Sequence, residues 1–105
     1  MSVFNKIKKE KLIFQGQYFF LIKDSYPVSL GHVLIISNEE KKDYFELESF
    51  ERNELSDLII KAKELINKEY TPDGYNIGMN CGMVAGQSVM HFHCHVIPRY
   101  KGDMK

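Results

Sequence analysis

The chain has 105 residues, of which 44% are hydrophobic and 27% charged, and its 14 basic residues balance 14 acidic ones. This length predicts a single domain over residues 1–105, built around one core. The charge balance gives no indication of a nucleic-acid partner, and the apolar runs are too short to cross a membrane. Two cysteines without a C-x-x-C pattern, and a start without the apolar core of a signal peptide, favour a cytoplasmic protein with reduced thiols.

The first third of the chain predicts a short helix followed by three strands. Apolar residues at 3, 4 and 7 fall on one face of a helix over residues 2–10. The runs 11–14, 17–23 and 31–37 are rich in β-forming residues. Gln15-Gly16 predicts a tight hairpin between the first two runs, and the longer stretch DSYPVSLG leads to the third.

The rest of the chain predicts one long helix and two further strands. From Glu48 or Ser49 the apolar residues follow a helical period up to Thr71-Pro72-Asp73-Gly74. The residues of this stripe are Leu55, Leu58, Ile59, Ala62, Leu65, Ile66 and Tyr70. Residues 74–80 then read as a strand, 81–88 as a glycine-punctuated loop and 90–98 as the last strand. Five strands, one long helix and short loops predict an α+β domain with an antiparallel sheet.

Three of the four histidines alternate within the run HFHCHVIPR at residues 91–99. On a strand, His91, His93 and His95 would share one face, and Phe92, Cys94 and Val96 would share the other. Side chains of the second set are those of a core. The pattern therefore predicts one chemical face and one buried face.

Three uses of the imidazoles compete. They could be structural side chains that face water, or an H-x-H pair that binds zinc with His32 as a third ligand. They could also act on phosphorus, because a neutral imidazole is a good nucleophile near pH 7. Gly86, Gln87 and Ser88 come directly before the strand and offer N–H, carboxamide and hydroxyl donors. With no carboxylate beside the imidazoles in the sequence, this donor set favours a phosphate group over zinc.

Several of these motifs resemble those of the histidine triad (HIT) superfamily. HFHCHVI is similar to its histidine signature, GQSV stands at the equivalent place, and GHVLIIS and DGYNIGMNCG resemble its other strands. The likeness extends from Phe4 to Asp103. It implies an α+β HIT-like fold, with a five-stranded antiparallel sheet, one long helix, a short N-terminal helix and sheets joined in a homodimer.

The resemblance also implies an activity. HIT proteins act at the α-phosphate of a nucleotide through a covalent nucleotidyl-histidine, without a required metal or cofactor. The expected substrates are purine nucleotides, either dinucleoside polyphosphates or nucleoside 5′-phosphoramidates. Two rival functions remain: a zinc hydrolase using His32, His93 and His95, and a nucleotide-binding module with incidental turnover. SVFNKI stands where many bacterial relatives have C-x-x-C, so a zinc-stabilised variant is not expected.

The roles implied for the catalytic group are specific. His93 is the nucleophile, and a main-chain carbonyl is expected to hold its other ring nitrogen. His95 and Gln87 are expected at the phosphate oxygens or the leaving group, and Ser88 at the phosphate. His91 and His32 are expected to support the strand as a pair.

The nucleoside part of the site rests on side chains that also have simpler explanations. Asp24 is implied as the residue that accepts the ribose hydroxyls, although it could only cap the turn before Pro27. Asn80 is implied near the phosphate and sugar, although it could be a turn residue. The apolar clamp implied around the base could equally be core; it consists of Val3, Phe4, Ile7 and Ile22.

Overall fold

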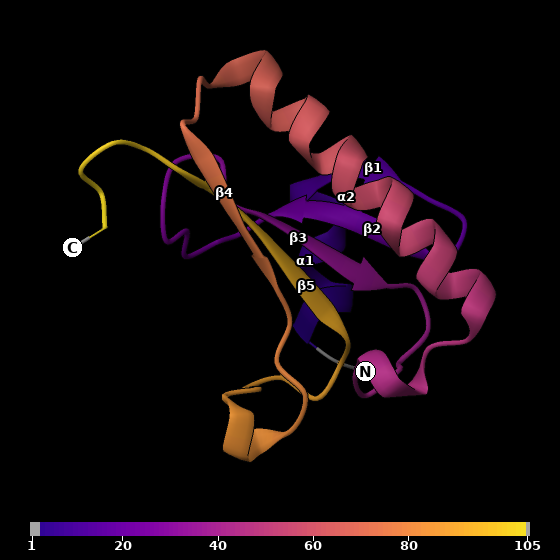
Figure 1. The fold of residues 1–105 in the computed structure, drawn as a ribbon. Coiled ribbons are helices and arrows are strands. Elements are labelled where there is room, and N and C mark those ends of the chain that lie inside the picture. Colours follow the sequence, from indigo (N-terminus) through magenta and orange to yellow (C-terminus); the bar gives the residue numbers. More distant parts are fainter. Residues whose placement is uncertain (1–2, 105) are drawn as a thin grey trace.

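Five strands form one antiparallel sheet in the computed structural model of the protein, which describes residues 3–104 (Figure 1). The strands lie in the order β1-β2-β3-β5-β4. Strands β1 and β2 form the hairpin predicted around Gly16, whose N–H donates to the carbonyl of Phe19. The strands are β1 (Leu12–Gln15), β2 (Phe19–Lys23), β3 (Val33–Ser37), β4 (Gly74–Gly78) and β5 (His93–Arg99).

The two helices lie on opposite faces of this sheet. Helix α2 (Ser49–Glu69) covers one face, and the short helix α1 (Val3–Lys11) lies behind the other (Figure 1). Cys94 is fully buried on the α2 side, and burial raises the pKa of its thiol to about 12. Strand alternation therefore separates a large core under α2 from a smaller one under α1. The small core consists of Phe4, Phe20, Ile22, Leu34 and Ile36.

Helix α2 begins and ends where the sequence predicted. Its start is a capping box, in which Glu48 and Glu51 accept each other's backbone N–H groups. The predicted apolar stripe faces the sheet, with Leu55 and Ile66 among its buried members. Within residues 3–104, no helix is both long and apolar enough to cross a membrane. Two short 3₁₀ helices, η1 (Tyr44–Glu46) and η2 (Met83–Ala85), lie in the loops.

Strands β3 and β5 both start later than predicted. The strand predicted from residue 31 starts at Val33, because Gly31 adopts a left-handed φ of 92°. The strand predicted from residue 90 starts at His93, because the N–H of Phe92 donates to the carbonyl of Lys41 at 2.6 Å. His91 therefore precedes the strand that was expected to include it, although its ring still lies against Phe4, as the ring of His93 does, at a centroid distance of 5.7 Å.

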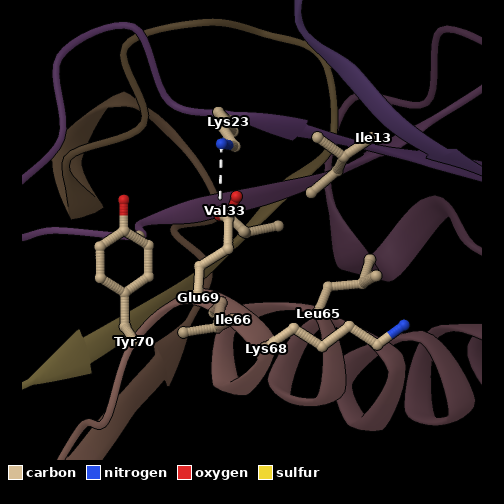
Figure 2. A pocket seen from close by; sticks show the side chains of 9 residues that line it. Ile13, Lys23, Val33, Leu65, Ile66, Lys68, Glu69 and Tyr70 are labelled. Atoms are coloured by element: carbon tan, nitrogen blue, oxygen red, sulfur yellow. Dashed lines mark hydrogen bonds and ion pairs between the residues drawn. The ribbon is translucent and has the colours of Figure 1, made fainter.

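Each face of the sheet carries a cavity. On the α2 side, a cavity of about 350 Å³ has an apolar wall that includes Val33 and Ile66. Figure 2 shows Lys23 across this cavity from Glu69, and the two form an ion pair of 3.3 Å. No described histidine lines this cavity. The chemistry expected of the histidines therefore belongs to the opposite face.

Candidate active site

A pocket of about 430 Å³ opens on the α1 face, where β3 and β5 lie side by side. His93 and His95 project into it from β5, opposite Ile36 and Leu34 of β3, with ring centroids 5.2 Å apart. One part of the pocket is apolar and the other part is polar. The lining residues are Phe4, Ile7, Ile22, Asp24, Ser25, Tyr26, Leu34, Ser88, Val89, His93 and His95.

The ring of His93 is held in one orientation with one nitrogen free. Its Nδ1 lies 2.8 Å from the carbonyl oxygen of His91. A carbonyl oxygen can only accept, so Nδ1 carries the proton and Nε2 keeps its lone pair. Phe4 packs edge-on against the same ring at a centroid distance of 5.0 Å. This is the main-chain carbonyl contact expected for a nucleophilic histidine.

The tautomer of His95 follows from a chain of hydrogen bonds. The N–H of Val28 donates to Nδ1 of His32 at 3.1 Å, so the proton of a neutral His32 is on Nε2. That Nε2 lies 2.9 Å from Nδ1 of His95, which must accept. The proton of His95 is consequently on its Nε2. The pocket thus contains a lone pair on His93 beside an N–H donor on His95.

Burial favours the neutral forms of His32 and His95, the two histidines joined by these hydrogen bonds. Desolvation lowers the pKa of His32 below its ordinary 6.5, although Asp24 opposes the shift. Desolvation also lowers the pKa of His95, with smaller contributions from His93 and His32, while Asp24 again acts in the other direction. A neutral His32 and a neutral His95 are the forms that the hydrogen-bond chain requires.

Asp24 caps a turn and also lines the pocket. Its Oδ1 accepts the N–H of Tyr26 at 2.9 Å, so it does cap the turn. Its Oδ2 lies 3.4 Å from Nε2 of His32, and the side chain also lines the pocket. Each carboxylate oxygen has a second lone pair. The carboxylate can therefore accept a hydrogen bond from a bound molecule without leaving the turn.

Gln87 faces inward rather than toward the pocket. Its Oε1 accepts the N–H of Gly82 at 2.7 Å, and its Nε2 donates to the carbonyls of Lys42 at 2.6 Å and Val89 at 3.1 Å. The side chain is buried, and both ends of its amide are occupied. In this structure Gln87 ties the glycine loop to the segment before η1, whereas the resemblance implied a contact with the phosphate oxygens or the leaving group. Its neighbour Ser88 does line the pocket.

His91 and His32 lie at opposite ends of β3, and no described contact joins them. His91 is fully buried with its Nε2 2.8 Å from the carbonyl oxygen of Ser37, which is the last residue of β3. His32 directly precedes β3 and contacts His95. The two histidines support β5 from separate places instead of forming one pair.

The remaining predicted residues are only partly assembled. Phe4, Ile7 and Ile22 line the pocket, whereas the side chain of Val3 lies outside the described part of the structure. Asn80 is exposed and outside the pocket lining, and its Nδ2 donates to the carbonyl of Gly86 at 3.3 Å.

Sequence reasoning missed four lining residues. Of these, Leu34 could have been found from strand alternation, which places it and Ile36 on the face opposite Val33 and Ile35. Ser25, Tyr26 and Val89 lie in loops without a periodic signal.

Comparison with known proteins agrees with this architecture. A family model described as the HIT domain matches residues 5–102. An uncharacterized HIT-like protein of Methanocaldococcus jannaschii is 37% identical over 95 residues, which are 89% of this chain and 71% of that protein. An AP-4-A phosphorylase of Mycobacterium tuberculosis is 31% identical over 93 residues, or 88% of this chain, and the match spans only 48% of that longer enzyme.

The three-dimensional structure is also similar to solved ones. The crystal structure of a HIT family protein from Bacillus anthracis matches with a TM-score of 0.87 at 31% identity, covering 96% of this chain and 74% of that one. The family model covers most of the chain, and two histidines of the signature, His93 and His95, line the pocket. The chain therefore belongs to the HIT family.

Proposed function

We propose that the protein hydrolyses or transfers nucleotides at the α-phosphate through a covalent bond to His93. The observation that carries this proposal is the hydrogen bond between Nδ1 of His93 and the carbonyl of His91, which leaves Nε2 with its lone pair inside the pocket. A nucleophile held in one tautomer and one orientation needs little rearrangement to attack. The AP-4-A phosphorylase among the relatives supports a nucleotide as the substrate.

The reaction would proceed in two displacements. Nε2 of His93 forms a bond to the α-phosphorus while the bond to the leaving group breaks, and the N–H of His95 stabilises the charge that develops there. A polyphosphate leaves as an anion, whereas an amine leaves from a nitrogen that has taken up one proton from solvent, which the later hydrolysis step returns. Water then attacks phosphorus, the bond to His93 breaks, and the product is a nucleoside monophosphate and one released proton.

The two parts of the pocket suit the two parts of a nucleotide. The apolar part, with Phe4, Ile7 and Ile22, would bind the base, and a purine would bury more apolar area there than a pyrimidine. Asp24 would accept the ribose hydroxyls, while Ser88 and His95 would donate to the phosphate. Dinucleoside polyphosphates and nucleoside 5′-phosphoramidates both present this nucleoside phosphate unit.

We propose that the reaction needs no metal. Among the described residues, ligand atoms of Asp24, His32 and His95 lie within 4.8 Å of one another, which is close enough for a metal ion to bridge them. However, the N–H of Val28 points at Nδ1 of His32, which puts the proton on Nε2, the atom that a metal would need. A metal bound to Nε2 of His32 would move the proton to Nδ1 and break the hydrogen bond from the N–H of Val28. The donor set therefore supports hydrogen bonding better than zinc coordination.

A substrate panel in the presence of a chelator tests this function. We expect turnover of an adenosine 5′-phosphoramidate or a diadenosine polyphosphate to continue unchanged in EDTA, with adenosine monophosphate as a product in mass spectrometry. The purified protein should also lack stoichiometric zinc. Loss of turnover in EDTA that zinc restores would support the zinc hydrolase instead, and tight binding without turnover would support a binding module.

Asp24→Asn separates the ribose contact from the turn. Asparagine keeps an oxygen for the N–H of Tyr26 but replaces the other carboxylate oxygen with an N–H₂ group, which cannot accept from the ribose. A hydrogen bond to a charged acceptor contributes roughly 1.5–3 kcal/mol. We expect adenosine monophosphate to bind roughly 10- to 150-fold more weakly, and its 2′,3′-dideoxy analogue to bind with little change. Calorimetric titration of both ligands measures this. Equal losses for the two would restrict Asp24 to its role in the turn.

We also infer that the protein forms a homodimer. Strand β4 is an edge of the sheet, so one side of its backbone has no strand beside it within residues 3–104, and Ile77 on this strand is exposed. Pairing of two such edges would join two sheets, as the resemblance implies. Light scattering should give a mass of about two chains, and a mass of one chain would contradict the inference.

A further inference from the structure

Tyr26 stands out from the other exposed apolar side chains. Its exposed fraction is 90%, and in residues 3–104 no other large exposed hydrophobic residue also lines the active-site pocket. Isolated apolar residues on a surface are common and need no explanation. An aromatic ring at the mouth of a catalytic pocket is different, because a bound molecule can cover it.

The backbone on both sides of Tyr26 is tied to residues of the site. Its own N–H donates to Oδ1 of Asp24 at 2.9 Å, and the N–H of Val28 donates to Nδ1 of His32 at 3.1 Å. Pro27 lies between these two contacts and restricts the backbone further. The backbone of the segment is therefore anchored to the site. In contrast, no described aromatic ring or cation packs on the Tyr26 ring.

We propose that Tyr26 determines base recognition, by stacking its ring on the nucleobase of the bound nucleotide. This proposal rests on the proposed function. The inner apolar residues Phe4, Ile7 and Leu34 would contact the base from the protein side, and Tyr26 would cover the side that faces solvent. Two residues span at most about 7 Å of chain, so a ribose bound at Asp24 leaves its base within reach of the Tyr26 side chain.

The chemistry of the side chain suits this role. Aromatic side chains stack on bases whatever their hydrogen-bonding edges are, and larger bases offer more surface to stack on. Because the free ring is already exposed to water, covering it with a base removes apolar surface of both partners from solvent. Tyr26 would accordingly favour purines over pyrimidines through contact area.

The test compares a ligand that has a base with one that lacks it. Binding of adenosine 5′-monophosphate and of ribose 5-phosphate is measured by calorimetric titration for the wild type, Tyr26→Phe and Tyr26→Ala. We expect Tyr26→Ala to weaken binding of the nucleotide roughly 5- to 150-fold, the range of one base–aromatic stack, and to change binding of ribose 5-phosphate less than twofold. Tyr26→Phe should bind both ligands as the wild type does.

Phe45→Ala provides a matched control, because Phe45 is also an exposed aromatic residue, at 79%, but lies outside the pocket lining. It should leave binding of both ligands unchanged. If Tyr26→Ala weakens both ligands equally, or weakens neither, the stacking role is wrong. Failure of the proposed function would look different: the wild type would neither bind the nucleotide nor show turnover that depends on His93.

Discussion

Replacement of His93 by alanine is expected to reduce turnover by about 10⁶-fold, the loss seen when a covalent catalyst loses its nucleophile. His93 supplies the Nε2 lone pair that the hydrogen bond to the His91 carbonyl leaves free. No other described imidazole in the pocket offers such a lone pair, because the proton of His95 is on Nε2. Steady-state rates on a phosphoramidate or a dinucleoside polyphosphate measure the loss.

Nucleotide binding should survive this substitution. The pocket residues Ile7, Ile22, Asp24 and Ser88 make no described ring or hydrogen-bond contact with His93, so we expect the affinity for adenosine monophosphate to change little. The ring of Phe4 loses an edge contact with His93, and a thermal melt would detect any resulting loss of fold. A large drop in both affinity and stability would mean that His93 is structural.

A trapping experiment tests the proposed covalent intermediate directly. Wild-type protein incubated with an α-labelled nucleotide and quenched in alkali should carry the label on His93, because a phosphoramidate survives base and breaks in acid. His93→Ala should carry none. Label on another residue, or full activity of His93→Ala, would refute the nucleotidyl-histidine mechanism.

Replacement of His95 by alanine should cost about 10²- to 10³-fold in turnover, the scale of one donor to charge that develops in a transition state. The lone pair of His93 remains in this variant, so label should still accumulate on His93, but more slowly. Because burial lowers the pKa of His95, the wild type should retain the neutral donor at pH values below the ordinary 6.5. Single-turnover labelling rates at several pH values measure both effects.

His32→Ala tests the hydrogen bond that sets the tautomer of His95. It removes the group that donates to Nδ1 of His95 and leaves His95 itself in place, so His95 is free to place its proton on either nitrogen. We expect a loss of turnover smaller than that of His95→Ala, since one tautomer of His95 still donates into the pocket. A loss in His32→Ala that exceeds the loss in His95→Ala would show that His32 does more than set the tautomer.

The sequence by itself determined the elements and the face on which the chemistry lies. The two-residue period of a strand placed His93 and His95 opposite Cys94 and Val96, and the structure confirms this division. The helical period likewise predicted α2 and the stripe that it buries. These features follow from local backbone geometry, so neighbouring residues were sufficient to predict them.

Only the tertiary structure decided how the polar groups are used. His91 precedes β5 because the N–H of Phe92 bonds to Lys41, a residue 51 positions earlier (92 − 41 = 51). Gln87 is taken up by Gly82 and by the carbonyl of Lys42, 45 residues away, so a donor that looked available for phosphate is occupied.

The protonation pattern and the pocket mouth depend on long-range contacts in the same way. The proton of His95 is on Nε2 because His32, 63 residues earlier, donates to the other nitrogen. Tyr26 is a loop residue without periodic neighbours, and only its place beside the pocket distinguishes it from other exposed residues. Periodicity reports which face a side chain occupies, whereas a hydrogen bond depends on the group that the folded chain brings to within about 3 Å of it.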